Sequence, residues 1–403
     1  MTLHFPDAVL PDTPIYAHYA AQMQAGRLPY RDFAVVYPPV SLPIFLLPAL
    51  LAGTTAFHPY NSTFGLLMAA CGAGAVATAM YVLAHQTRRI GQLIAGLALG
   101  GLAPLLLGPL ILSRYDGWPA LLTTLALAMI LFDRSRLGFG ILALAVGAKA
   151  YPLAILPVLL VYVWRNHGGR RALSSLAVFV AVLVCAIAPF AILAPHGLWA
   201  SVKLQTSRPL QMESLGASLL LVAHQVAGVH LVQVTFDGST NLVGTTAGRL
   251  ASASGWLEVA AIIAITLQFL RGSATRERTL FATAAAICAF IALDRVLSPQ
   301  YLIWLVPLVV VLPRTWGVVT SALLGVTLVL TQLWFPSRYF QLVAFAPLPS
   351  WLVFSRDILL IVLLGTLVWP LRVAAEPARR RAPHTSEPAA EPELVPSRAD
   401  FTF

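Results

Sequence analysis

Charged side chains are scarce in this sequence. Asp, Glu, Lys and Arg make up only 10% of the 403 residues, whereas soluble globular domains carry about 25%. Hydrophobic residues reach 58% and the mean hydropathy is +0.80, which gives more apolar surface than a soluble fold of this size can cover. The composition therefore excludes an ordinary soluble enzyme and a disordered chain. The apolar runs are long and continuous, which excludes a β-barrel and predicts an all-α, polytopic transmembrane helical bundle.

Cysteine is also rare. The three cysteines, Cys71, Cys185 and Cys288, lie far apart inside apolar runs, which excludes a disulfide scaffold and indicates small buried hydrophobic side chains. The sequence contains no His and Cys spacing typical of a metal site, no DxD pair and no dinucleotide-binding loop. We expect no nucleotide-sugar site and no required cofactor, while a divalent cation held by Asp12 and Asp32 stays an open alternative.

Apolar runs divide the chain into candidate membrane segments. A spanning helix needs about 20 apolar residues, and six runs are of that order while five are shorter. This pattern predicts a multi-pass membrane protein. The longer runs are 63–85, 90–112, 172–194, 255–271, 317–335 and 351–371, and the shorter ones are 118–132, 138–147, 152–164, 280–293 and 300–312.

Most arginines lie in short clusters between these runs. That distribution is typical of the cytoplasmic face of a membrane, so the net charge of +10 does not indicate nucleic-acid binding. If every cluster is cytoplasmic, the chain crosses an even number of times between consecutive clusters. The 28 residues between Arg136 and Arg165 are too few for two full spans. They predict two half-length helices that meet at a break over residues 149–152, and the same device is expected with a break over 294–300.

Both predicted breaks carry charge. Interrupted helices at membrane depth are tolerated only against protein or a water-filled cavity, and charge at that depth indicates a functional site. Two charged breaks on the same side predict a cavity that opens on the outer face. We expect an outer loop over residues 1–39, a transmembrane domain over 40–372 with an outer loop at 195–254, and a disordered cytoplasmic tail over 373–403.

Three other segments need separate predictions. Residues 40–57 are apolar but contain Pro43 and Pro48, so they either cross the membrane or form a re-entrant or interfacial helix. Residues 214–228 predict a re-entrant or interfacial helix, and the Gly-, Ser- and Thr-rich stretch 237–246 predicts a loop. Tryptophans near the ends of the runs predict interfacial belts. These are Trp118, Trp164, Trp199, Trp256, Trp304, Trp334 and Trp351.

Residues 12–39 form a polar, aromatic segment directly before the membrane domain. They contain two carboxylates, Asp12 and Asp32, together with arginines and four tyrosines. Glycosyl transfer needs a carboxylate base for the acceptor hydroxyl, cations for a phosphate leaving group and aromatic rings against sugar or lipid. The segment offers all three. Structural alternatives are that Asp12 caps a helix over residues 13–25 and that Asp32 pairs with Arg31 or caps a turn.

Several short blocks occur in an order that resembles a known group of enzymes. The blocks are residues 12–39 with their YRDF and YPP elements, SRYDGWPALL at 113–122, GAKAYPLAILP at 147–157, and SRPLQMESLGASL at 207–219 followed by LSPQYLIWLVP at 297–307. Together they resemble membrane glycosyltransferases of the GT-C superfamily. More closely, they resemble glycosyltransferase family 87, the bacterial polyprenyl-phosphate-mannose-dependent alpha-mannosyltransferases and their relatives.

The resemblance implies a GT-C-like fold in the bacterial plasma membrane, with the active site on the extracytoplasmic face. It implies a catalytic Asp early in the first outer loop, where Asp12 in DTPIY matches best and Asp32 in YRDF is the second choice. An outer first loop makes 40–57 a re-entrant or interfacial helix. Family members usually have a transmembrane helix before this loop, and the eleven residues ahead of Asp12 are too few for one. We expect either an upstream start or a protein that does without that helix.

Lys149 at the first break is the main candidate for donor binding. A Lys in an apolar run needs an anion or water, so it either contacts the donor phosphate, pairs with Asp116 or Asp294, or lies hydrated at the outer boundary. Asp116 flanks Tyr115 with Arg114 at a helix start, which is typical of a cap with a local ion pair, and the family pattern makes it a reserve site residue.

The other candidate binding residues lie in the predicted outer loops and in the second break. Arg208 and Arg295 are suited to bidentate anion binding, with Asp294 as the partner of Arg295. Glu213 either caps the segment that follows it or binds donor. The remaining expected donor-phosphate or sugar ligands are Arg31, Tyr37 and Gln300.

These observations predict an integral-membrane hexosyltransferase. It moves a sugar, mannose or a relative, from a polyprenyl-phosphate donor to a cell-envelope glycolipid or glycan by inverting in-line displacement. A polytopic transporter or lipid flippase is the alternative, because broken helices with buried charge are also transporter features. A non-catalytic membrane partner of a cell-envelope complex is the third possibility.

Overall fold

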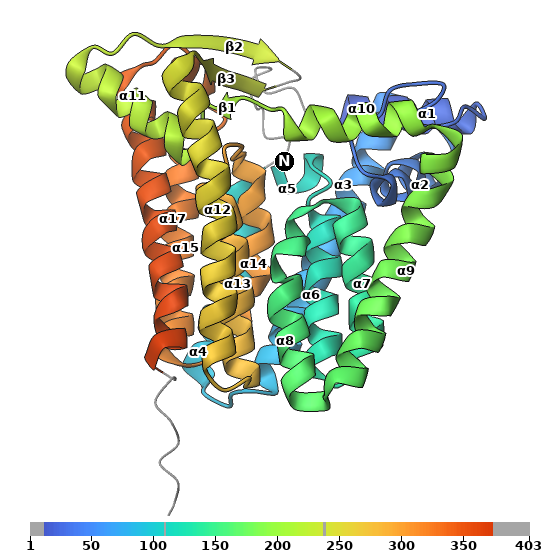
Figure 1. The fold of residues 1–403 in the computed structure, drawn as a ribbon. Coiled ribbons are helices and arrows are strands. Elements are labelled where there is room, and N and C mark those ends of the chain that lie inside the picture. Colours follow the sequence, from blue (N-terminus) through green and yellow to red (C-terminus); the bar gives the residue numbers. More distant parts are fainter. Residues whose placement is uncertain (1–11, 109, 237–238, 374–403) are drawn as a thin grey trace, which may run out of the picture.

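The computed structural model describes residues 12–108, 110–236 and 239–373, and long helices run side by side between its two ends (Figure 1). Six of the described helices are long and apolar enough to cross a membrane, which confirms the predicted all-α helical bundle. The expected tail beyond residue 373 lies outside the described residues. The six helices are α3 (Phe57–Ala84), α4 (Ile90–Leu107), α9 (Gly169–Leu193), α12 (Thr245–Arg271), α15 (Arg314–Trp334) and α17 (Pro347–Val373).

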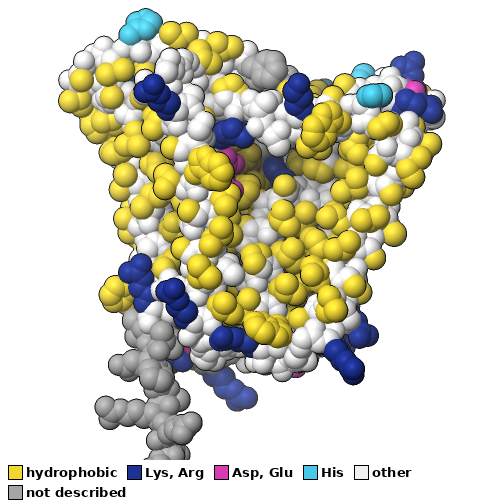
Figure 2. Space-filling view, viewed as in Figure 1, with side chains coloured by type: hydrophobic (Ala, Val, Ile, Leu, Met, Phe, Trp, Pro, Cys, Tyr) yellow, Lys and Arg dark blue, Asp and Glu magenta, His cyan; other side chains and the backbone are white. Residues whose placement is uncertain are grey.

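Arginine-rich loops gather at one end of the bundle, which we call the basic end. The Arg165 guanidinium donates to the Gly272 carbonyl oxygen over 2.5 Å, and Arg314 pairs with Glu277 over 2.8 Å. Loops far apart in the sequence therefore meet there, as the even-crossing rule predicts, and Figure 2 shows basic side chains gathered at this lower end. The opposite end, which we call the site end, carries α1, α10 and a small sheet (Figure 1).

The N-terminal part of the described chain lies at the site end (Figure 1). Helix α1 (Thr13–Gln24) packs against α2 (Leu42–Ala52), which follows the short 3-10 turn η1 (Pro39–Ser41) and leads into α3. With 11 residues, α2 is about 16 Å long, roughly half of a bilayer core. That length is short for a crossing, which favours the re-entrant or interfacial alternative. Gly53 ends α2 with φ 67°, a left-handed conformation that favours glycine.

Both predicted helix breaks are present. Helix α7 (Ser135–Ala148) stops at Lys149, whose backbone is extended, and a 3-10 turn η2 (Tyr151–Ile155) leads into α8 (Leu156–His167). Helix α13 (Arg276–Leu293) stops at Asp294, and η3 (Pro299–Tyr301) leads into the short helix α14 (Leu302–Val310). In the second break Pro299 keeps the preceding Ser298 extended, whereas in the first break the extended residue is Lys149 itself. Each break thus turns the chain back toward the basic end.

The segment 195–254 holds more regular structure than a loop. It contains α10 (Pro195–Thr206), α11 (Leu215–Ala227) and an antiparallel sheet of strand order β1-β3-β2. The predicted loop over 237–246 is wrong for residues 239–243, because they pair with neighbours on both sides and so satisfy backbone groups that a polar composition alone leaves open. The short helix expected at 214–228 is present as α11. The strands are β1 (Leu210–Gln211), β2 (Val232–Phe236) and β3 (Ser239–Val243).

The segment 195–254 packs directly against the N-terminal residues 12–39. Gly197 in α10 lies so close to the carbonyl of Tyr30 that an added Cβ would overlap it. The Gln205 side-chain amide also donates to the Val36 carbonyl oxygen over 3.0 Å. Residues 12–39 are thereby held between the bundle and α10.

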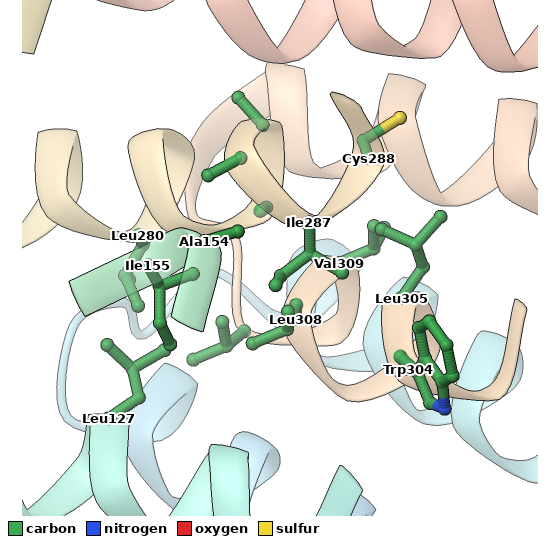
Figure 3. Packing of buried hydrophobic residues seen from close by; sticks show 14 of the residues in the cluster. Leu127, Ala154, Ile155, Leu280, Ile287, Cys288, Trp304, Leu305, Leu308 and Val309 are labelled. Carbon is green, nitrogen blue, oxygen red and sulfur yellow. The ribbon is translucent and has the colours of Figure 1, made fainter. Parts of the chain in front are cut away.

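The core lies where α6 (Gly117–Leu131) and η2 pack around α13 and α14. Every residue of α14 is buried, and Leu127, Ile155, Ile287 and Leu308 come together in Figure 3. This packing fixes both breaks relative to α6, whose first turn carries the charged cluster described next. The remaining short helices are α5 (Leu110–Ser113) and α16 (Tyr339–Val343).

Candidate functional site

Asp12 lies at the start of α1 and points into the bundle. Its carboxylate forms an ion pair with Arg114, and the hydroxyls of Tyr16 and Tyr37 donate to it over 3.2 and 3.3 Å. The side chain makes no capping hydrogen bond to α1, so the helix-cap alternative is wrong for Asp12. It keeps 21% of its side-chain surface exposed, which leaves room for one more partner.

Asp116 forms a second ion pair, with Lys149 of the first helix break. Lys149 Nζ donates to Asp116 Oδ1 over 2.7 Å, and the indole of Trp304 donates to the same oxygen over 2.8 Å. This is one of the partners expected for Lys149. Asp116 is fully buried and makes no capping bond to α6. Its carboxylate is therefore held by Lys149 of the first break and by Trp304 of α14.

Tyr115 joins the two ion pairs. The Lys149 ammonium lies 4.9 Å from the ring centres of Tyr115 and Trp304 and 5.1 Å from that of Tyr301, distances at which cation–π attraction is effective. The Tyr37 and Tyr115 rings meet edge to face at 5.2 Å. Carboxylates, cations and aromatic rings thus form one cluster. They come from residues 12–39, from the start of α6 and from both helix breaks.

Exposure separates the two carboxylates of this cluster. Asp116 has no exposed surface, whereas Asp12, Arg114 and Lys149 keep 21, 16 and 18% of their side-chain surface. A molecule that enters from the site end can therefore touch one carboxylate and two cations. Figure 2 shows a hollow near this end in which basic and acidic side chains are visible. This arrangement places one partly exposed carboxylate beside two partly exposed cations.

Asp32 and Arg31 belong to a separate turn. Asp32 accepts a backbone hydrogen bond from Leu28 over 2.7 Å and pairs with Arg31 over 2.9 Å, and both side chains are well exposed. The bond from Arg31, with that from Leu28, lowers the pKa of Asp32 to about 2. Both structural alternatives for Asp32 are therefore observed together, and these bonds lie within its own turn.

Arg208 and Glu213 approach the cluster from the segment 195–254. The Arg208 guanidinium donates to Ser239 Oγ over 2.9 Å, and its charge opposes the burial that raises the pKa of Tyr37. Glu213 is buried, and burial raises the pKa of its carboxyl to about 7. Ser214, rather than Glu213, caps α11, because its hydroxyl accepts from the Ala217 amide. The capping prediction for Glu213 is therefore wrong.

The polar residues of the second break bond within the break and to α10. Arg295 donates to the Thr206 carbonyl oxygen over 2.6 Å, and Asp294 accepts from the Val296 amide over 3.2 Å. The neighbouring positive charge of Arg295 also acts on Asp294, as expected for its partner. Gln300 accepts from the Ser298 hydroxyl over 3.1 Å. Only Tyr301 of this break lies over Lys149. Arg295 and Gln300 stay predicted donor ligands, and the bonds that they make in this structure are to other groups of the protein.

Several important residues were missed by the sequence analysis. The interfacial position expected for Trp304 and Trp334 is wrong, because both are buried, and hydropathy alone does not separate a buried ring from an interfacial one. Arg356 and Asp357 of α17 form a fully buried ion pair, with an N–O distance of 2.7 Å. Two adjacent opposite charges inside an apolar run were the available signal.

A metal site is not evident in the parts of the chain that the structure describes. Among those residues no group of three or more His, Cys, Asp or Glu side chains could hold an ion. The two carboxylates considered for a divalent cation, Asp12 and Asp32, are each paired with an arginine instead. These donors do not form the oxygen cage that Mg²⁺ or Ca²⁺ prefers.

Comparison with known proteins gives a resemblance to solved structures. No known family model matches the sequence, and no curated protein matches it. Two crystal structures of the Archaeoglobus fulgidus oligosaccharyltransferase are similar to this chain. The apo form has a TM-score of 0.43 and 12% sequence identity, and the match covers 91% of this chain and 52% of that chain. The form tethered by a disulfide bond to an acceptor peptide with an NVT sequon has a TM-score of 0.42 and 13% identity, and the match covers 91% of this chain and 51% of that chain. The chain spans about half the length of these structures. Membership of the GT-C superfamily or of glycosyltransferase family 87 stays a prediction from the sequence.

Proposed function

We propose that the chain is a membrane glycosyltransferase that moves a sugar, mannose or a related hexose, from a polyprenyl-phosphate donor to a cell-envelope glycolipid or glycan. The observation that carries the proposal is the single cluster in which an accessible carboxylate, Asp12, lies beside two partly accessible cations, Arg114 and Lys149. The cluster lies at the end of the bundle opposite the arginine-rich loops. That position supports an extracytoplasmic site under the positive-inside rule.

Asp12 serves as the general base. Its carboxylate takes the proton of the acceptor hydroxyl while that oxygen attacks the anomeric carbon of the sugar. The bond from the anomeric carbon to the phosphate oxygen breaks, and the electron pair leaves with the polyprenyl phosphate. Attack opposite to the leaving group inverts the anomeric configuration. Tyr16 and Tyr37 hold the carboxylate in place through their hydroxyls, which fixes the geometry that base catalysis requires.

Lys149 and Arg208 stabilise the departing phosphate. The Lys149 ammonium has three N–H donors. One of them donates a hydrogen bond to Asp116, so two stay available for phosphate oxygens. Asp116 and three aromatic rings hold the ammonium at the first helix break, and Arg208 adds a planar guanidinium from the segment above. Preorganised cations of this kind act most strongly where water is largely excluded.

A reconstituted transfer assay tests this proposal. The purified chain in lipid nanodiscs is supplied with polyprenyl-phosphate-mannose and candidate glycolipid acceptors, and the anomeric configuration of the product is measured by NMR. We expect transfer with inversion from the lipid-linked donor and none from a nucleotide sugar. Transfer from the nucleotide sugar alone overturns the proposal, and so does movement of the lipid across vesicles without sugar transfer, which supports a flippase.

A further inference from the structure

An apolar cavity opens between α3 and α4. It encloses about 550 Å³, a volume within the range of about 300–1,000 Å³ found for small-ligand pockets. Its floor is formed by α6 and α14, through Ala120 and Ile303. Its lining is almost entirely hydrocarbon. The charged cluster described above uses other residues, so this cavity is a separate feature.

Small residues create the cavity and leave it open to the bilayer side. Gly72 of α3 and Gly101 of α4 line it, and a Cβ atom added at either would meet nothing within 4 Å. Leu97 and Leu112, also in the lining, are 61 and 44% exposed. A hydrocarbon chain can therefore enter sideways from the membrane without first displacing a packed side chain.

The inner end of the cavity adjoins the charged cluster. Ala120 lies one helical turn after Asp116 on the same face of α6, and Ile303 precedes Trp304, whose indole donates to Asp116. Gly117 lies against the backbone of Met68, another lining residue. The ammonium of Lys149 is bonded to the same carboxylate. An anion-binding group thus lies at the head of an apolar cavity, which fits an amphiphile with an anionic head and a hydrocarbon tail.

We propose that this cavity receives the polyprenyl chain of the lipid-phosphate donor, and that Gly72 and Gly101 set the length and bulk of the chain that the protein accepts. The inference rests on the proposed function, because it places the donor phosphate at Lys149 and lets the chain run from there between α3 and α4. A lipid tail is already in an apolar medium before it binds. The cavity therefore selects by shape and available space rather than by hydrophobic transfer.

Filling the cavity tests the inference. Gly101→Phe and Gly72→Phe place a ring into the open space from opposite walls, and neither substitution opposes helix formation. Gly365→Phe is the matched control, since Gly365 of α17 is also exposed and has open space around its Cβ position but does not line the cavity. Sugar transfer in nanodiscs is measured with an eleven-isoprene donor and with a two-isoprene donor, for acceptors with long and with short lipid chains.

We expect both cavity variants to raise KM for the long donor by roughly tenfold or more, while Gly101→Phe leaves KM for the short donor within about twofold of wild type. The control changes neither value. Unchanged KM for the long donor in both cavity variants overturns the inference. A change that follows the acceptor's chain instead assigns the cavity to the acceptor and also overturns it.

A second readout separates this inference from the proposed function. A polyprenyl phosphate without sugar, carrying a photoreactive group at the far end of its chain, is cross-linked to the wild-type protein and the peptides are mapped. We expect labelling of α3 and α4 that is lost in Gly101→Phe and kept in Gly365→Phe. Absence of sugar transfer with this labelling present refutes the enzyme but keeps the cavity assignment, and labelling elsewhere refutes the cavity assignment alone.

Discussion

Asp12 and Lys149 bind the two residues that flank Tyr115. Asp12 forms an ion pair with Arg114, and Lys149 donates to Asp116 over 2.7 Å. The four side chains carry two charges of each sign, so the cluster is neutral as a whole and escapes much of the cost of burying single charges. The polar N-terminal segment and the first helix break are thereby joined in one site.

Removal of the Lys149 charge should lower the stability of the folded protein. Lys149→Met leaves the Asp116 carboxylate buried without a counter-ion, which costs about 3–5 kcal/mol. A second change, Asp116→Asn, should restore most of that stability, because the amide is neutral and can still accept from Trp304. Thermal unfolding in nanodiscs measures the first effect and its rescue. Sugar transfer should stay low in the rescued double variant, since the ammonium proposed to bind phosphate is gone. Full activity there contradicts the role proposed for Lys149.

Glu213 should make the protein less stable as the pH rises. Its pKa is about 7 when folded, against an ordinary value of 4.5. Below pH 4.5 the carboxyl is neutral in both states. Between 4.5 and 7 only the unfolded chain ionises, so stability falls by about 3 kcal/mol and then levels off above pH 7. Glu213→Gln should therefore raise Tm relative to wild type above pH 7 and have little effect below pH 4.5. An equal difference in Tm at both pH values contradicts this.

The Arg356–Asp357 pair in α17 should respond differently to single and double substitution. Asp357→Asn strands a fully buried guanidinium and should cost about 3–5 kcal/mol, whereas Arg356→Met combined with Asp357→Leu should restore stability close to that of wild type. Chemical unfolding of the three proteins in detergent measures the pattern. A double variant as unstable as the single one means that Arg356 acts mainly through its bond to the Glu213 carbonyl.

The two ends of the bundle should lie on opposite sides of the membrane. Gln24 at the site end and Arg88 at the basic end are both exposed, so Gln24→Cys and Arg88→Cys provide matched labels in a Cys185→Ala background. We expect an impermeant maleimide to label the Gln24→Cys protein in intact cells and the Arg88→Cys protein only after permeabilisation. The reverse pattern places the site end in the cytoplasm.

Features that depend on local sequence could be predicted. The breaks at Lys149 and Asp294 follow from prolines and from charge inside apolar runs, and the shared face of the arginine loops follows from counting crossings. These signals act over a few residues or over whole helices. The sequence also offers Asp116 as one partner for Lys149, because few anions are available at that depth.

Features that depend on tertiary contacts could not be chosen from the sequence. Asp12 and Asp32 have the same chemistry and the same kind of neighbours in the chain, and only packing shows that Asp12 points inward to Arg114 while Asp32 closes its own turn. The burial of Trp304 depends in the same way on its contact with Asp116. The strand β3 forms because β1 and β2 supply partners, which a Gly- and Ser-rich stretch does not reveal.

Asp12→Asn in the reconstituted transfer assay is the most direct test of the account, with Asp32→Asn as its matched control. The substitution keeps size and hydrogen-bonding shape but removes the base. We predict that Asp12→Asn lowers kcat by about 10²–10⁴-fold while binding of polyprenyl phosphate stays within about twofold of wild type, and that Asp32→Asn keeps most of the wild-type rate. If the Asp12→Asn protein transfers sugar as fast as wild type, Asp12 is not the base and the proposed chemistry is wrong.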